Sequence, residues 1–223
     1  MKFFEECIFM FSFLSFALFS SAFAEPTTYQ FDKASDLYVT VYKNDKTLLS
    51  GMAHNHAIRA KNWTGTLQWD AENPSACNIA IQFAVADLEV DSPYSRNLAA
   101  SKEKDPEIKK GFEKSISDSD RDSVKKNMLS DGQLNGNVHK TISFQSTSCT
   151  ESSITGNFTL RGVTKSITMP TKIKTAEEGP WKLLIKGGFS ISSTDFGFSP
   201  YSDLGGAVAN KSEMKIHVYL RGI

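Results

Sequence analysis

The amino-acid sequence predicts an all-β protein, an eight-stranded antiparallel barrel with one or two short helices in a long connection. Three observations lead to this fold class. Apolar and polar residues alternate along most of the chain after residue 24, about eight segments show this period of two, and a polar stretch near residues 101–130 lacks it. Half-buried strands show that period, and a closed antiparallel barrel has no free edge. A two-sheet sandwich is the structural alternative.

The first 24 residues predict a secretory signal peptide that is cleaved after Ala24. An apolar run extends from Cys7 to Phe19, and small residues follow it up to Ala22-Phe23-Ala24, a pattern that signal peptidase cleaves. The run is short for a bilayer-spanning helix, although the weak positive charge before it leaves a retained anchor as the alternative. We therefore expect an exported, periplasmic protein with a single domain over residues 25–223.

Strands are expected wherever the alternation is continuous. Ile79, Ile81 and Phe83 share one face of such a segment, and a glycine-containing turn near Gly162 makes residues 154–173 a hairpin. Alternation alone does not say which face is inside, because a shift of one residue exchanges the two faces. In chain order the segments are 37–42, 48–59, 63–70, 79–86, 141–148, 154–173, 181–192 and 214–221.

Residues 101–130 predict one or two short helices instead of strands. Ile108 and Phe112 are four residues apart, as are Val124 and Met128, which places each pair on one helix face. Asp118 or Ser119 is available as an N-cap. These helices either cover one end of the barrel or form a polar excursion across its surface.

Charge is balanced, with 25 Lys and Arg residues against 25 Asp and Glu residues. Binding to nucleic acid or to an anionic membrane surface usually requires a basic patch or stripe. The composition therefore predicts no nucleic-acid partner.

Two cysteines, Cys77 and Cys149, remain after the predicted cleavage site. An exported protein can oxidise such a pair to a disulfide. Strand parity favours two free thiols, because Cys77 shares a face with Ile79 whereas Cys149 falls opposite the face of Ile142 and Phe144. Both states stay open at this point.

His54 and His56 are the most suggestive polar pair, since residues two apart on a strand project from one face. They share that predicted face with Met52 and Ile58. Three roles are open: hydrogen bonding at the rim of the core, contact with the polar end of a ligand, or half of a metal site. His217 is expected to face outward.

Sequence patterns of known catalytic sites are absent, including the nucleophile elbow, the zinc-protease helix and phosphate-binding glycine loops. The triplet Asp195-Phe196-Gly197 is interpreted as a strand that ends in a glycine-assisted turn. The sequence therefore predicts neither a catalytic residue nor a complete metal site.

One segment, GNFTLRGVTKSITMP, closely resembles the hairpin of the YceI-like family of exported lipid-binding proteins. Four further pieces agree in order, namely SGMAHNHAI, RDSVKKNML, TISFQS and FSISSTDFGF, and the resemblance extends from Tyr29 to Leu220. Ser166 stands where the family usually has proline. The resemblance implies a lipocalin-like antiparallel barrel whose apolar interior holds an isoprenoid chain, with no established catalytic residue.

We therefore expect a periplasmic carrier or storage protein for an isoprenoid lipid, such as a polyprenyl compound or a quinone. It would require no cofactor and no metal, would not be an enzyme, and would meet the membrane only transiently as its source of lipid. A metal-dependent enzyme or redox accessory that uses the histidine pair is the alternative, and a ligand-free interaction module is a third hypothesis. The predicted ligand-binding residues are His54, His56, Phe83, Phe144, Phe158 and Phe196.

Overall fold

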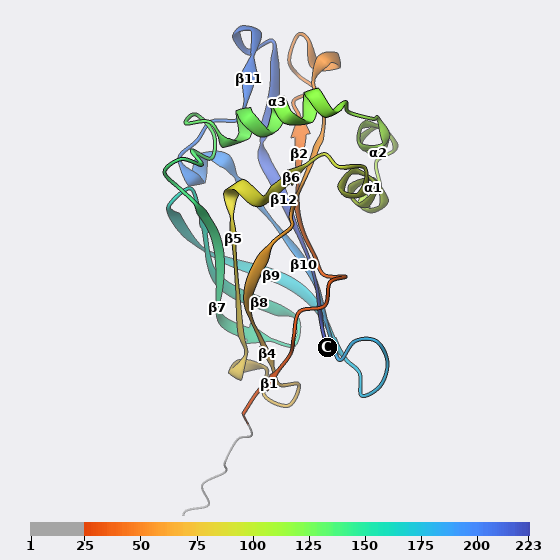
Figure 1. The fold of residues 1–223 in the computed structure, drawn as a ribbon, viewed down its shortest axis with the longest axis vertical. Coiled ribbons are helices and arrows are strands. Elements are labelled where there is room, and N and C mark those ends of the chain that lie inside the picture. Colours follow the sequence, from red (N-terminus) through yellow and green to blue (C-terminus); the bar gives the residue numbers. More distant parts are fainter. Residues whose placement is uncertain (1–24) are drawn as a thin grey trace, which may run out of the picture.

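The computed structural model describes residues 25–223, so the predicted signal peptide lies outside the described residues. These residues form one curved, antiparallel half-barrel with three α-helices at its upper end (Figure 1). Between residues 25 and 223, none of the helices has the length and apolar character needed to cross a bilayer. The all-β, antiparallel prediction is confirmed at this level. The predicted closed barrel is not, because within residues 25–223 the two end strands of the sheet do not pair with each other and the sheet forms a half-barrel.

Twelve strands are present in the described chain, more than the eight predicted. Three of the additional strands have only two or three residues, which is too short to show a period of two. The strands are β1 (Thr27–Thr28), β2 (Asp36–Lys43), β3 (His56–Ala60), β4 (Trp63–Trp69), β5 (Asn78–Ala84), β6 (Leu88–Val90), β7 (Thr141–Thr150), β8 (Ser153–Leu160), β9 (Val163–Thr175), β10 (Leu183–Ser192), β11 (Ser202–Asp203) and β12 (Val208–Gly222).

The strand order is β1-β4-β5-β7-β8-β9-β10-β12-β2-β3-β6, with β11 paired to β12. At the lower end the segment after β1 runs across to the end of β12. The Gln30 amide donates to the Ile223 carbonyl at 3.0 Å, and the Ile223 amide donates back to the Gln30 carbonyl at 2.9 Å. The N-terminal segment therefore links β4 to β12 and draws the two parts of the sheet together.

Three helices follow β6, where one or two were predicted. Each begins with a side-chain cap, from Ser92, Asp105 and Ser117 respectively, so the cap of the last helix lies one residue before the predicted Asp118. The first helix was missed because its buried residues include the small Ala99 and Ala100, which give no apolar stripe. The helices are α1 (Pro93–Lys102), α2 (Pro106–Glu113) and α3 (Asp118–Leu129).

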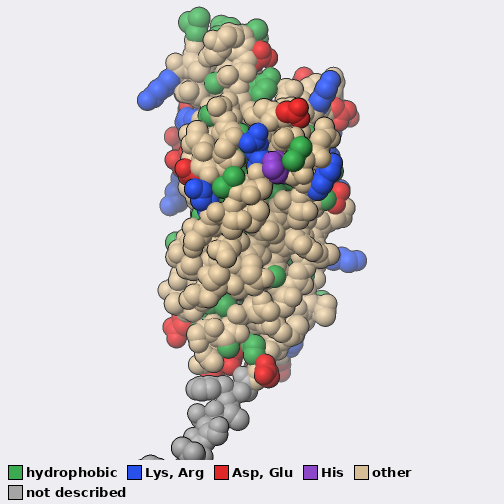
Figure 2. All heavy atoms as spheres, turned by 90° about the vertical axis from the view of Figure 1, so that its left-hand side faces the viewer, with side chains coloured by type: hydrophobic (Ala, Val, Ile, Leu, Met, Phe, Trp, Pro, Cys, Tyr) green, Lys and Arg blue, Asp and Glu red, His purple; other side chains and the backbone are tan. Residues whose placement is uncertain are grey.

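The helices occupy two places. α1 and α2 lie against the outside of the sheet near β2 and β3, where Ala99, Ala100 and Phe112 pack with Tyr38 and Tyr42. α3 runs across the upper end of the half-barrel (Figure 1). On the face shown in Figure 2, charged side chains gather in the upper half of the molecule, and the lower half shows few. The helical end is therefore also the charged end on that face.

The strand predicted over residues 48–59 is only partly correct. Residues 44–55 form a loop with a short helical turn at Ser50–Met52, and β3 begins at His56. The loop leaves the sheet because its Leu49 amide donates to the Ala207 carbonyl of the β11–β12 connection, at 2.8 Å. His54 therefore precedes the strand and does not share its face with His56.

Cys77 and Cys149 form a disulfide, with their Cα atoms 6.2 Å apart. The parity argument for free thiols was wrong because a bulge shifts the β7–β8 register between Ser146 and Ser148. Such a bulge inserts one residue and exchanges the two faces beyond it. Cys149 consequently faces inward opposite Ile154 and is 4% exposed.

We expect the double variant Cys77→Ala/Cys149→Ala to lose about 2–4 kcal/mol of unfolding free energy, because the disulfide constrains the unfolded chain over a long loop. The two cysteines are 72 residues apart. Urea unfolding of the wild type with and without a reducing agent measures the same quantity independently. Equal midpoints for all three samples would contradict the prediction.

Candidate functional site: an apolar cavity

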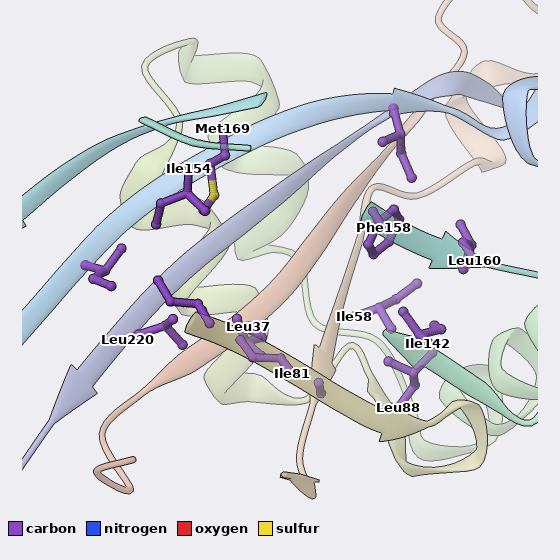
Figure 3. Packing of buried hydrophobic residues seen from close by; sticks show 14 of the residues in the cluster. Leu37, Ile58, Ile81, Leu88, Ile142, Ile154, Phe158, Leu160, Met169 and Leu220 are labelled. Carbon is purple, nitrogen blue, oxygen red and sulfur yellow. The ribbon is translucent and has the colours of Figure 1, made fainter. Parts of the chain in front are cut away.

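An apolar cavity of about 240 Å³ lies inside the half-barrel. Its walls come from the inward faces of strands β2, β3, β5, β6, β7, β8, β9, β10 and β12. Figure 3 shows these side chains pointing toward one another from facing strands. Those that it labels all line the cavity: Leu37, Ile58, Ile81, Leu88, Ile142, Ile154, Phe158, Leu160, Met169 and Leu220.

Three of the four predicted phenylalanines line this cavity: Phe83, Phe144 and Phe158. Phe158 is 8% exposed and packs edge-on against Phe189, with ring centroids 5.6 Å apart. Phe196 is different, because it lies in the short helical turn after β10 and is absent from the cavity lining. Its ring packs edge-on against Phe158, with ring centroids 5.7 Å apart. Phe196 therefore contacts a residue of the cavity wall without lining the cavity itself.

His56 lines the cavity at the first residue of β3. Its Nδ1 lies 2.6 Å from Oδ2 of Asp91, which directly follows β6. Burial alone would raise the pKa of the Asp91 carboxyl. Hydrogen bonds from His56 and Ala57 and the charge of Arg96 outweigh burial, and the pKa lies below its ordinary value. A carboxylate only accepts hydrogen bonds, so Nδ1 of His56 carries the proton that it donates.

Arg96 completes this buried network from the second turn of α1. Its Nη1 donates to Oδ1 of Asp91 at 2.9 Å and to the Asn55 carbonyl at 2.8 Å. Nη2 donates to the Gly111 carbonyl at 2.7 Å, and Nε donates to the Lys114 carbonyl at 3.0 Å. One guanidinium therefore joins α1, α2 and the approach to β3, and it holds the carboxylate that orients His56.

His54 lies close enough for the charge of His56 to affect it, but it is not part of the cavity lining. Burial lowers the pKa of His54, and the neighbouring His56 lowers it further. Within residues 25–223, no three His, Cys, Asp or Glu side chains come together as a metal site would need. His54 thus lies near His56, Asp91 and Arg96, but it precedes β3 and does not share the strand face that the sequence predicted for the two histidines.

His217 faces outward from β12, as its alternation predicted, and it is partly buried against β2. Its ring stacks on Tyr38 with centroids 4.4 Å apart, and its Nε2 lies 3.1 Å from Oγ1 of Thr40. Burial lowers the pKa of His217 to about 4. This histidine therefore packs on the outer face of the sheet, and it is absent from the cavity lining.

The upper end of the cavity is polar, and sequence reasoning did not find it. We call this the polar end; its residues are Asn127, Gln133, Tyr201, Asn210 and Lys211. The Asn127 amide donates to the Tyr201 hydroxyl at 3.2 Å, and the Asn210 backbone amide donates to the Tyr201 carbonyl at 2.9 Å. Asn127 and Lys211 are exposed, so the polar end borders solvent.

α3 forms part of this end, because Val124 and Met128 also line the cavity. Their spacing of four residues was the one sequence signal for this contact. α3 thus covers one end of the half-barrel, which was one of the two alternatives that the sequence left open for this helical segment. The polar residues gave no signal, since they come from four separate stretches of chain.

Comparison with known proteins gives a consistent result. The model of the YceI-like domain family matches residues 29–220, which confirms the resemblance seen in the sequence. No curated protein matches the chain. The crystal structure of BcnA from Burkholderia cenocepacia aligns with a TM-score of 0.59 at 12% identity, covering 87% of this chain and 100% of that one.

A crystal structure of the Campylobacter jejuni YCEI protein aligns with a TM-score of 0.46 at 14% identity, covering 74% of this chain and 83% of that one. At these identities the BcnA structure supports the fold, and the family model over residues 29–220 supports the assignment. The chain belongs to the YceI-like domain family.

Proposed function

We propose that this protein binds one isoprenoid-type lipid, such as a polyprenyl compound or a quinone, in its cavity and acts as a carrier or store for it. The observation that carries the proposal is the predominantly apolar lining of the cavity below its polar end. Each buried methylene contributes about 0.8 kcal/mol, so about ten of them contribute ~8 kcal/mol before the cost of ordering the chain. Tail burial would therefore supply most of the affinity.

The size of the cavity supports a slender ligand. Its volume of about 240 Å³ lies below the range of about 300–1,000 Å³ found for pockets that hold drug-sized molecules. A single extended chain suits such a space better than a fused ring system. The head group would lie at the polar end, where Tyr201, Asn127 and Asn210 offer hydrogen bonds and Lys211 offers a positive charge.

We further propose that this carrier acts in the periplasm. The predicted signal peptide supports export, and the disulfide between Cys77 and Cys149 supports an oxidising compartment. The role is one of binding without catalysis, in keeping with a family built on a binding-protein fold.

Native mass spectrometry of the exported chain, purified without detergent, tests the proposal. We expect the mass of the polypeptide plus one lipid, and organic extraction followed by mass spectrometry should identify an isoprenoid or quinone. The polypeptide mass alone, unchanged after incubation with vesicles that contain ubiquinone or a polyprenyl phosphate, would contradict the proposal. Release of a fatty acid instead would keep lipid binding and reject the isoprenoid class.

A further inference from the structure

Two loops at the upper end of the molecule carry apolar side chains that contact little of the protein. In the loop between β2 and β3, Leu48 is 88% exposed, Met52 62% and Leu49 38%; Leu204 in the β11–β12 connection is 57% exposed. Both loops project beyond α3 in Figure 1, and Figure 2 shows hydrophobic side chains at the very top of the molecule. We call Leu48, Leu49, Met52 and Leu204 the apolar tip.

The apolar tip is one structural unit, although its residues come from distant parts of the chain. The Asn44 amide donates to the Ala209 carbonyl and the Leu49 amide donates to the Ala207 carbonyl, both at 2.8 Å. These bonds hold the two loops side by side. Isolated exposed apolar residues are common on soluble proteins, whereas a group of them on one projection marks an interaction site.

The tip adjoins the polar end of the cavity. Asn210 and Lys211 line the cavity, and they directly follow the segment that bonds to the β2–β3 loop. Lys211 also lies 3.3 Å from Asp45 in that loop. A surface that held the apolar tip would therefore lie close to the polar end of the cavity, where Asn127 and Lys211 border solvent.

A bilayer fits this tip better than a protein partner. Stable protein interfaces involve about 20–30 residues on each side, whereas this tip is a convex projection of four apolar side chains. A bilayer interface accepts such inserted side chains individually, with their apolar parts among the acyl chains. Lys46 is exposed beside them, and Lys43 and Lys211 are paired with Asp45, so local charge adds little.

We propose that the apolar tip inserts into the interfacial region of a lipid bilayer and thereby presents the polar end of the cavity to the membrane for lipid exchange. This inference rests on the proposed function. Leu48, Leu49, Met52 and Leu204 are then the residues that make the transient contact with the membrane.

Co-sedimentation of the exported chain with phosphatidylcholine vesicles tests the insertion. The variant Leu48→Asp/Met52→Asp places two charges where apolar side chains would enter the bilayer, and we expect its partition to fall about tenfold or more. Ile223→Asp is the control, because Ile223 is 56% exposed and is the residue at the end marked C in Figure 1, at the opposite end of the molecule from the tip. That control should bind vesicles as the wild type does.

A transfer assay separates this inference from the proposed function. Uptake of ubiquinone from vesicles should slow by the same factor in Leu48→Asp/Met52→Asp, while native mass spectrometry still finds one lipid per chain after long incubation. If the wild type carries lipid but does not bind vesicles, the proposed insertion of the apolar tip is wrong and the proposed function still holds. Vesicle binding without any captured lipid would overturn the proposed function instead. The wild type could instead form a dimer that does not bind vesicles, with Leu48→Asp/Met52→Asp remaining a monomer. That result would show that the apolar tip contacts a second copy of the chain, and it would overturn the inference.

Discussion

Asp91→Ala is expected to lower the free energy of unfolding by about 3–5 kcal/mol, because it leaves a buried guanidinium without its counter-charge. Asp91 is 1% exposed and Arg96 is 4% exposed, so solvent cannot replace the lost partner. His56 and the Ala57 amide lose their acceptor at the same time. Urea unfolding of the purified chain, with the linear extrapolation, measures the change.

Two further variants show whether charge is the cause. Asp91 has a φ of 49°, a conformation that Asn tolerates better than Ala, so Asp91→Asn keeps the backbone while removing the charge. It should lose less stability than Asp91→Ala but remain clearly destabilised. Glu113→Gln breaks the half-exposed pair with Lys109 and should cost no more than about 0.5 kcal/mol. If Asp91→Ala and Glu113→Gln lower the free energy of unfolding by the same amount, the buried ion pair of Asp91 with Arg96 does not stabilise the fold as proposed.

Val218→Trp is expected to reduce lipid affinity about a thousandfold while the chain stays folded. Val218 points into the cavity from β12 and is only half-buried, because open space lies in front of it. An indole there would displace about five methylene groups of a bound chain, or ~4 kcal/mol at about 0.8 kcal/mol each. Titration with ubiquinone, followed by native mass spectrometry, measures the loss.

The neighbouring position supplies the control for this variant. Tyr219 lies on the opposite face of β12, with the Lys186 ammonium 5.1 Å from its ring centroid. Tyr219→Trp therefore adds bulk to the same strand without entering the cavity, and it should bind lipid as the wild type does. Full lipid occupancy in Val218→Trp would place the ligand somewhere other than the cavity.

The alternation of apolar residues predicted much of the cavity wall. Ile79, Ile81 and Phe83 do line it together, and the helical spacing of Val124 and Met128 does place both residues of α3 at the cavity. These predictions succeeded because they depend on spacings of two and four residues, which the backbone geometry of a strand or helix sets locally.

Predictions failed where they assumed that a strand continues regularly through a bulge or a loop. The parity of Cys149 was reversed by the β7 bulge, and His54 left the strand face because the β2–β3 loop pairs with the β11–β12 connection. Neither a bulge nor a pairing between distant loops leaves a periodic trace in the chain. The same holds for the strands of two or three residues, whose partners alone define them.

The sequence by itself determined that this chain is built of strands with one apolar face, that its family is YceI-like, and that a helical segment interrupts the strands. Only the tertiary structure decided which faces enclose the cavity, which residues make its polar end, and that Asp91 meets His56 across 35 residues. The physical reason is distance along the chain. Local spacing follows from backbone geometry, whereas register and side-chain partners follow from packing between segments that come together only in the folded protein.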